Sequence, residues 1–250
     1  MKAFEYHINA IKITLEQFSK GRFIAFFIPA FILTIIYWYF EYNLTRANSV
    51  ASWLSFLPWV GEYAEVGVGY GFSALDWILT QVYIFVVLTV LSPVNTYLSE
   101  KLDGRLTGFE MKFDILRFIN DFFRMVFIVF LAITMELMVM GIYWIISWIF
   151  GFGFMDAVMY FLIAAFFFGF SFYDYSLERY GVGVFGTIGY AFKNMLTMIL
   201  TGSIFLLIFE VPYIGIPIAP GIAVMVATIV YLYRENKYPV KKDIKPTIEE

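Results

Sequence analysis

The chain has 250 residues, of which 61% are hydrophobic and only 15% are charged. Soluble domains are about 45–50% apolar and about 25% charged, and a water-soluble fold of this size could not bury so many large apolar side chains. Aromatic residues make up 22% of the chain, which excludes intrinsic disorder. The composition therefore indicates an integral membrane protein.

The sequence also excludes several kinds of chemistry. It contains no cysteine and a single histidine, His7, so thiolate nucleophiles and histidine metal clusters are impossible. The net charge of −3 argues against nucleic acid as a partner. We expect a protein that is not an enzyme and that has no cofactor and no metal site.

Residues 1–19 have the pattern of an amphipathic helix. Their apolar side chains recur every three or four residues, which is the spacing of one helix face. A helix lying on the membrane surface is one interpretation, and a helix docked on its own protein is the other. The apolar positions are Phe4, Ile8, Ile11, Leu15 and Phe18.

Six apolar segments follow in chain order. A membrane-spanning helix needs about 20 residues, so the first two segments are long enough to cross, and the third is long enough for a tilted or broken span. The last three are shorter, and we expect 125–172 and 195–233 to form two helical hairpins, either fully crossing or re-entrant. The predicted fold class is thus an all-α integral membrane protein with two long transmembrane helices, two helical hairpins and an amphipathic N-terminal helix. The segments are 23–40, 74–92, 125–150, 157–172, 195–209 and 221–233.

The basic residues predict the orientation. Sixteen of the 17 lie in four regions, namely 1–22, 93–124, 173–194 and 234–250. Two hydrophobic segments separate each of these regions from the next, so the four regions lie on the same side of the membrane. By the positive-inside rule, both termini are cytoplasmic. We expect one membrane domain over 1–238 and a disordered cytoplasmic tail over 239–250.

Glu136 is the candidate intramembrane acid, because it interrupts an apolar run of 26 residues. Ionisable groups at such positions are costly and usually face the bundle interior or a cavity. One interpretation is a carboxylate on a solute or proton pathway. The other is a neutral, hydrogen-bonded acid with a structural role, or one that reaches water near a hairpin tip.

The stretch 109–124 is predicted to be a cytoplasmic amphipathic helix. Arg117, Asp121 and Arg124 follow one another at steps of three and four residues, which permits an acid–base ladder. Such a ladder is usually structural. At the mouth of a solute pathway, where the dielectric constant is low, the ladder would instead gate or orient a charged solute.

Gly21 and Arg22, just before the first span, form the best candidate anion site. Glycine permits close approach of the backbone, arginine presents a planar fork of donors, and the first amides of the following helix point to the same place. A plain positive anchor for the span is the alternative.

Three stretches of the sequence resemble the CysZ sulfate permeases of the etoposide-induced-protein membrane family. They are Leu-Ser-Pro-Val-Asn-Thr-Tyr-Leu-Ser-Glu-Lys-Leu-Asp-Gly-Arg-Leu-Thr-Gly over 91–108, Phe-Tyr-Asp-Tyr-Ser-Leu-Glu-Arg-Tyr-Gly over 172–181, and the proline loop 212–220 followed by Ala-Val-Met-Val-Ala-Thr over 223–228. They lie in the family's order, and the resemblance covers nearly the whole chain.

The resemblance implies a multi-pass protein of the bacterial inner membrane that forms homo-oligomers and carries sulfate for cysteine biosynthesis. The family's sulfate motif is Gly-Leu-Arg with a second arginine, eight residues before a proline. Gly21 stands eight residues before Pro29, Arg22 takes the leucine position, and Phe23 takes the first arginine position. The family's acid–base pair corresponds to Asp121 and Arg124.

These observations lead to two expectations of function. The first is a passive permease for sulfate or a related oxyanion, with the lipid bilayer and the anion as its partners. In it, Gly21, Arg22 and Phe23 bind the anion, and Asp121, Arg124 and Arg117 control the mouth. The second is a membrane scaffold or interaction protein that transports nothing.

Overall fold

The fold is taken from a computed structural model that describes residues 2–51, 90–108, 115–211 and 213–238. Within these ranges, the side chains of residues 41, 44–51, 115, 117, 118 and 121 are not described. The predicted second span, 74–92, therefore lies almost wholly outside the described residues. The predicted disordered tail, 239–250, lies outside them as well.

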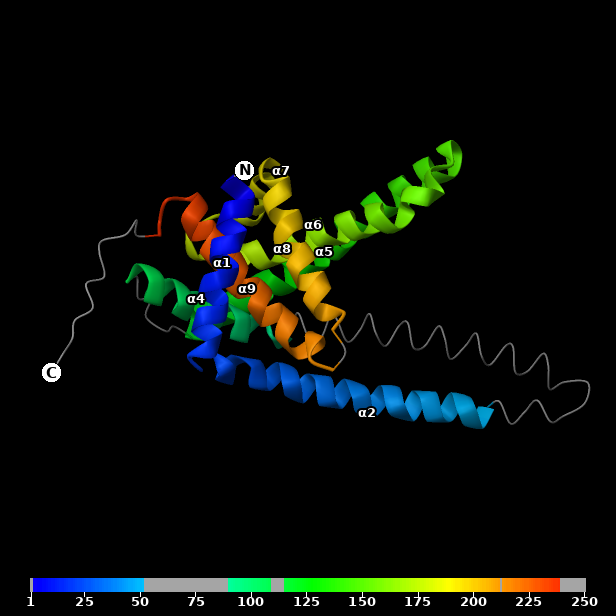
Figure 1. Ribbon diagram of the computed structural model, residues 1–250, viewed down its shortest axis with the longest axis horizontal. Helices are drawn as coiled ribbons and strands as arrows, with labels where there is room; N and C mark the ends of the chain where they lie inside the picture. Colours follow the sequence, from blue (N-terminus) through cyan, green and yellow to red (C-terminus); the bar gives the residue numbers. More distant parts are fainter. Residues whose placement is uncertain (1, 52–89, 109–114, 212, 239–250) are drawn as a thin grey trace, which may run out of the picture.

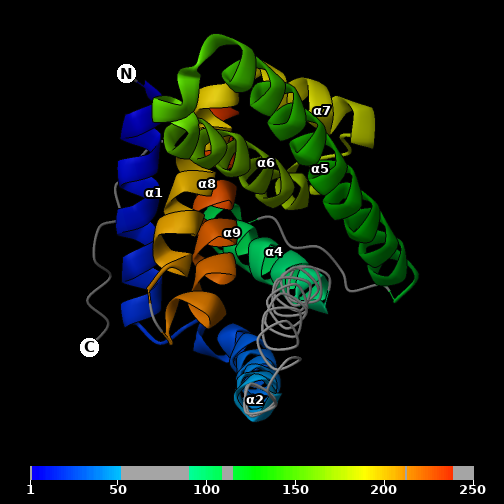
Figure 2. The same cartoon turned by 90° about the vertical axis from the view of Figure 1, so that its right-hand side faces the viewer.

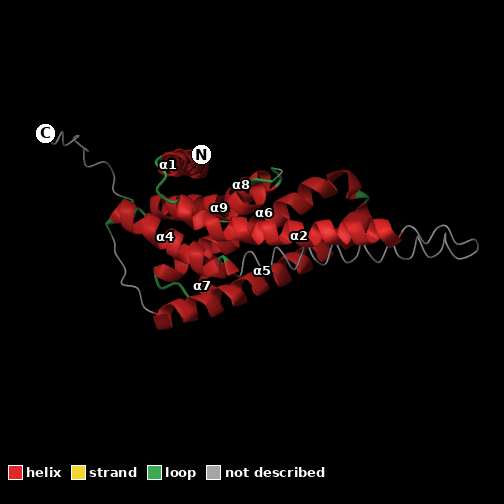
Figure 3. Cartoon of the chain, turned by 90° about the horizontal axis from the view of Figure 1, so that it is seen from below, coloured by secondary structure: helices red, strands yellow, loops and turns green. Residues whose placement is uncertain are grey.

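All regular structure in the described ranges is helical (Figure 3), as the composition and apolar periodicity predicted. Each long helix contains an extended apolar run or an apolar stripe at helical spacing, which favours this structure. The helices are α1 (Lys2–Ser19), η1 (Ile24–Phe27), α2 (Ile28–Ala51), α4 (Ser92–Thr107), α5 (Ile115–Phe150), η3 (Phe152–Met155), α6 (Asp156–Arg179), α7 (Val184–Lys193), α8 (Met195–Phe209) and α9 (Gly215–Arg234).

Three helices are long and apolar enough to cross a membrane. They are Phe122–Phe150, Phe152–Arg179 and Gly215–Arg234. Two helix pairs satisfy the same criteria together but bend sharply, by 98° between Lys2–Ser19 and Ile24–Phe40 and by 94° between Val184–Lys193 and Met195–Phe209. The described part of the chain thus has three candidate spans, or up to five if each bent pair counts as one.

The helices divide into a body and two projections (Figure 1). In the body, α1, α8 and α9 lie side by side (Figure 2), with α4, α7 and the C-terminal half of α6 around them. The most buried helix is α9, which contacts α1, α4, α6 and α8. The projections are α2 and the hairpin of α5 and α6, which extend from the body in different directions.

Two glycines let α6 and α8 approach closely within the body. A Cβ at Gly202 would lie 1.7 Å from the carbonyl oxygen of Ala165, and one at Gly169 would lie 2.1 Å from that of Met198. Small residues are the usual means by which helix backbones come together in membrane proteins. These two positions therefore fix the crossing of α6 and α8.

The projections expose large apolar side chains on most of their surface. Around the tip of the α5–α6 hairpin, Trp148 is 79% exposed and Phe154 is 83% exposed. The tip is held by Asp156, whose Oδ1 accepts hydrogen bonds from Tyr143 Oη at 2.9 Å and from Ser147 Oγ at 2.6 Å. Surfaces of this kind suit contact with lipid, where exposing apolar side chains has no cost.

The hairpin helices are longer than the uninterrupted apolar runs predicted. The helix that contains the fourth segment, 157–172, continues to Arg179. It does so because the polar residues that follow the segment, such as Asp174, lie inside the body and are paired there. The last segment, 221–233, begins six residues earlier, at Gly215. Pro217 lies in the first turn, where its missing N–H is not needed, and Pro220 removes only one helical hydrogen bond. The predicted cytoplasmic helix 109–124 is, from Ile115 onward, continuous with α5.

The amphipathic helix α1 docks on α8 and α9 through its small and polar side chains. His7, Ala10, Thr14 and Gln17 are buried, whereas Phe4, Ile8 and Leu15 are each more than half exposed. Nε2 of His7 lies 2.9 Å from the Thr201 hydroxyl of α8. Of the two interpretations of residues 1–19, docking on the protein is therefore observed, with the apolar face left free for a membrane surface.

Candidate functional site: a buried polar network between α4, α6 and α9

One face of α4 carries polar side chains into the body. Ser92, Asn95, Ser99 and Asp103 recur at three- and four-residue steps and are at most 3% exposed. These spacings place all four side chains on one side of the helix. We call this row the α4 stripe, which extends for about 16 Å at 1.5 Å per residue.

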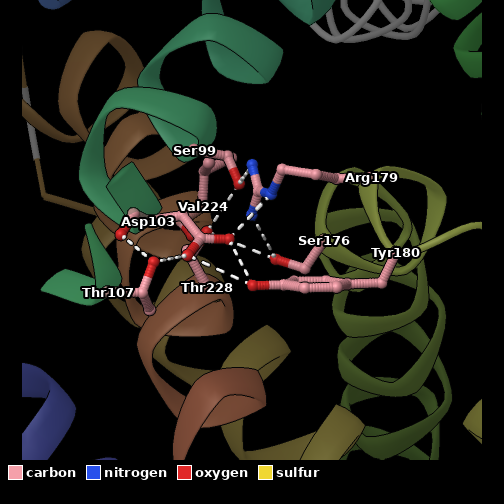
Figure 4. A network of polar contacts seen from close by, with 8 residues as sticks. All are labelled: Ser99, Asp103, Thr107, Ser176, Arg179, Tyr180, Val224 and Thr228. Atoms are coloured by element: carbon pink, nitrogen blue, oxygen red, sulfur yellow. Dashed lines mark hydrogen bonds and ion pairs between the residues drawn. The ribbon is translucent and has the colours of Figure 1, made fainter. Parts of the chain in front are cut away.

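The C-terminal end of the α4 stripe holds an ion pair that is almost completely buried (Figure 4). Nε of Arg179, from the last turn of α6, lies 2.8 Å from Oδ2 of Asp103, and both side chains are at most 2% exposed. The phenol of Tyr180 donates to the same carboxylate at 3.0 Å, and the Thr107 hydroxyl donates to it at 3.0 Å. Asp103 thus receives positive charge and hydroxyl donors together, as a buried carboxylate requires.

Hydroxyl groups continue the network toward α9. Nη1 of Arg179 donates to Ser99 Oγ at 3.1 Å, and Nη2 donates to Ser176 Oγ at 3.4 Å. Ser99 in turn lies 2.8 Å from the hydroxyl of Thr228, which Ser176 also reaches at 3.5 Å. Thr228 is anchored to its own helix through the carbonyl of Val224. Three helices therefore share one continuous set of polar contacts.

A second ion pair, in which Asp174 is fully buried and Arg124 is partly exposed, joins α5 to α6 and α7. Arg124 contacts both carboxylate oxygens of Asp174, with Nη2 to Oδ1 at 2.7 Å and Nε to Oδ2 at 3.2 Å. Its Nη2 also donates to the carbonyl of Val182 at 2.8 Å, and its Nε lies 3.5 Å from Glu178. Thr187 of α7 donates to Asp174 Oδ1 at 2.8 Å. A bidentate arginine fork of this kind fixes orientation as well as charge.

Burial raises the pKa of Tyr180, next to Arg179, to about 12, and the negative charge of Asp103 acts in the same direction. The Tyr180 phenol therefore stays protonated at neutral pH and remains a donor to Asp103. The side chain of Lys237 lies over the same ring, 3.9 Å from its centroid. This cation–π contact ties the residues that follow α9 to the network.

The network consists of arginine, carboxylate and hydroxyl groups. In the described residues, no group of three or more histidine, aspartate or glutamate side chains could hold a metal ion. An arginine fork that already holds a carboxylate has the geometry to hold another oxyanion in its place. The chemistry that this arrangement offers is a change of partner, in which an arginine releases its aspartate and binds an oxyanion from solution.

The candidate anion residues at the first span have different surroundings. Gly21, with φ of 68°, ends α1: its own N–H bonds the Phe18 carbonyl and the N–H of Arg22 bonds that of Gln17. This is the geometry of a Schellman cap. Arg22 is exposed, with Nη1 3.5 Å from Gln17 Oε1, whereas Phe23 is buried against Phe26. Gly21 and Arg22 are thus accessible, and Phe23 is part of the core.

The other predicted site residues are only partly described. Arg124 pairs with Asp174 and Glu178, and the side chains of Arg117 and Asp121 lie outside the described residues, so the predicted ladder stays a prediction. Glu136 lies at the middle of the candidate span Phe122–Phe150 and is half-buried. Within the described part of the chain, it has neither a hydrogen bond nor an ion pair.

The sequence analysis did not select Asp103, Arg179 or Asp174 as site residues. Two signals pointed to them. The polar residues of 92–103 recur at helical spacing within an apolar protein, and Asp174 and Arg179 lie in a stretch that resembles a known family. Pairing between α4 and α6 could not be read from either signal, because the partners are 76 residues apart.

Comparison with known proteins adds no assignment: no protein-family model matches this chain, and no curated protein matches it.

Proposed function

We propose that this helical protein is a permease for sulfate or a related small oxyanion, with the Asp103–Arg179 pair as part of its path. The observation that carries the proposal is the burial of this pair, together with hydroxyl groups from α4, α6 and α9, inside a protein whose outer surface is apolar. Ionisable residues inside membrane proteins usually mark solute or ion pathways. The resemblance of 91–108 and 172–181 to sulfate permeases supports the same class of solute.

The proposed mechanism is an exchange of partners at Arg179. A tetrahedral anion that arrives from the C-terminal end of α4 competes with Asp103 for the guanidinium of Arg179. Ser99 and Ser176 supply neutral hydroxyl donors on the far side, where they replace part of the anion's hydration, while Thr228 keeps its bond to the Val224 carbonyl. Arg22, exposed beside Gly21, raises the local anion concentration at the protein surface through its charge.

The test is uptake of radiolabelled sulfate into liposomes that contain the purified protein. We expect uptake above that of empty vesicles, and strong loss of uptake in Arg179→Lys, which keeps the charge but loses the planar fork. Arg22→Ala should slow uptake, while Lys20→Ala should not, because Lys20 is exposed and paired with Glu16. Uptake equal to that of empty vesicles under several gradients would exclude the permease.

A specific observation favours a second candidate, a membrane scaffold that transports nothing. The described partners of Arg124 and Arg179 are carboxylates, hydroxyls and one carbonyl of the protein itself, as in a purely structural network. A scaffold predicts that Arg179→Lys lowers thermal stability and that no variant changes anion uptake. The flux assay and a melting curve on the same preparations separate the two functions.

A further inference from the structure

The polar network around Arg179 reaches the surface through the side chains of two of its members. Six of the eight side chains drawn in Figure 4 are buried, whereas those of Thr107 and Tyr180 are half-buried. Both of these side chains donate to the carboxylate of Asp103. Within the described residues, a solute that approaches Arg179 from outside therefore meets Thr107 or Tyr180 first.

The observed position of Tyr180 closes the approach to the ion pair. Its phenol shares a hydrogen bond between Oδ2 of Asp103, at 3.0 Å, and Oδ1, at 3.3 Å. Its ring centroid lies 5.8 Å from Cζ of Arg179. The side chain thus lies against both members of the pair. An anion that takes the place of Asp103 at Arg179 requires this phenol to leave first.

Tyr180 is also the side chain that is better placed to move. The Thr107 hydroxyl is bonded to the Asp103 carbonyl of its own helix at 2.9 Å, which keeps it on α4. Tyr180 instead follows the last residue of α6, where Gly181, with φ of 78°, turns the chain. Helix ends open locally at a lower cost than helix interiors. Rotation of this one side chain would uncover the carboxylate.

Lys237 holds the Tyr180 ring in the closed position. Its Nζ lies 3.9 Å from the ring centroid. Its backbone is fixed by the cap that ends α9, in which the Lys237 N–H donates to the Leu232 carbonyl at 2.8 Å and Asn236 has φ of 52°. This is the geometry of a Schellman cap. The place of the ammonium group over the ring is therefore set by the end of α9.

The surroundings of Lys237 suit a contact that opens and closes. Lys237 is exposed, and among the described residues no carboxylate lies within 4.0 Å of its Nζ, whereas Lys20 pairs with Glu16. A cation–π contact at an exposed site is weak, so thermal motion breaks it readily. The same exposed charge attracts anions to the approach that Tyr180 covers.

We propose that Tyr180 is a gate over the Arg179 site and that Lys237 keeps this gate closed. When the ammonium group leaves the ring, the phenol turns away from Asp103 and the guanidinium becomes accessible. Both are positioning residues, because they control access to Arg179 rather than hold the solute there. The gate rests on the proposed function for the identity of the solute, but its opening can be measured without transport.

The test exploits the absence of cysteine from this chain. Ser99→Cys introduces a single thiol behind Tyr180, at the position that Nη1 of Arg179 contacts. Ser176→Cys, at the position that Nη2 contacts, is the second reporter if the first fails to fold. A small uncharged methanethiosulfonate is added to the purified full-length protein, and mass spectrometry follows the labelling rate. Because the reagent must reach the thiol, this rate reports how often the gate is open.

We expect slow labelling of the reporter protein that keeps both gate residues. Lys237→Ala should raise the labelling rate about two- to fivefold, the equivalent of one exposed cation–π contact. Tyr180→Phe, which loses the hydrogen bond to Asp103, should raise it about fivefold. Lys237→Arg keeps a cation over the ring and should restore slow labelling, which a role of Lys237 in the helix cap alone would not require.

Lys101→Ala is the matched control. Lys101 is likewise exposed and lies over a tyrosine ring, 5.4 Å from the centroid of Tyr97, but neither residue belongs to the network. The reporter protein with this change should label as slowly as its parent. Equal acceleration by Lys101→Ala and Lys237→Ala would overturn the gate, since loss of any such surface lysine would then suffice.

The remaining outcomes separate the gate from the permease. Labelling that neither Lys237→Ala nor Tyr180→Phe accelerates would overturn the gate, even in a protein that takes up sulfate. Acceleration by both variants, with slow labelling in Lys237→Arg, supports it. The same labelling pattern in a protein without sulfate uptake would support a gate over the buried site and exclude the permease.

Discussion

The body of this molecule encloses charged and polar side chains within its core, whereas the projections expose large apolar ones. In the body, the Asp103–Arg179 pair and several hydroxyls are enclosed by α4, α6 and α9, and the Arg124–Asp174 pair lies between α5, α6 and α7. On the projections, residues such as Trp148 and Phe154 are largely exposed. In water this distribution would be unstable, because it hides charge and exposes apolar surface. In a bilayer it is the expected one, since lipid covers the outside and polar groups must be satisfied within the protein.

The largest expected effect comes from breaking one buried ion pair of the body. Asp103→Leu should lower the free energy of unfolding by about 4 kcal/mol, because the Arg179 charge is left buried without its partner. The double variant Asp103→Leu with Arg179→Met should recover most of this loss. Thermal melts of the purified variants measure both. A double variant no more stable than the single one would contradict this account of the pair.

Close helix packing in the body should come next. Gly202→Ala places a methyl group against the Ala165 carbonyl, where the Cβ would lie at 1.7 Å, and should destabilise the protein by about 3 kcal/mol. Gly141→Ala, on the projecting part of α5, meets nothing within 4 Å and should be neutral or slightly stabilising. Melting temperatures compare the two. Equal effects would show that the α6–α8 crossing does not depend on glycine.

A charge on a projection tests whether lipid surrounds it. Leu137 is 64% exposed near the middle of the candidate span Phe122–Phe150, so Leu137→Lys should make insertion less favourable by about 2.5 kcal/mol. Leu116, which precedes the span, should tolerate the same change. The fraction of each variant recovered in the membrane measures the difference. Equal recovery would mean that water, not lipid, contacts this part of α5.

The smallest effect is expected at the edge of the network, where Tyr180 meets the solvent. Tyr180→Phe should cost about 1 kcal/mol through the lost hydrogen bond to Asp103. The pKa of Tyr180 is raised to about 12, so the folded state keeps this proton more tightly than the unfolded state does. Stability should therefore fall as pH rises from about 10 toward 12, and it should fall less in Tyr180→Phe. Melting curves over this pH range test the sign.

The sequence predicted the projections better than the body. Long apolar runs such as 125–150 define spans by composition alone, and α5 indeed covers this run. The α6 helix was underestimated, because its polar residues from Asp174 to Arg179 interrupt the apolar pattern, although they are buried and paired in the fold. Composition cannot distinguish a polar residue that faces water from one that faces a partner helix.

The candidate site shows the same limit. Gly21, Arg22, Arg124 and Glu136 were selected from local signals, such as position before a span or within one. The pairing of Arg124 with Asp174 joins residues 50 positions apart, and no periodicity within either helix encodes it. Only the packing of α5 against α6 and α7 brings the two together.

The docking of α1 on α8 and α9 has a consequence for biogenesis. Tyr6 stacks on Tyr233 with ring centroids 5.8 Å apart, and His7 meets Thr201, which follows it by 194 residues, so α1 binds a surface that is synthesised much later than α1 itself. At about 5–20 residues per second, translation separates the two by tens of seconds. During that interval α1 can bind the membrane surface only through its apolar stripe of Phe4, Ile8 and Leu15. Docking of α1 is therefore a late step of folding, and a chain truncated before α9 should reach the membrane without a docked α1.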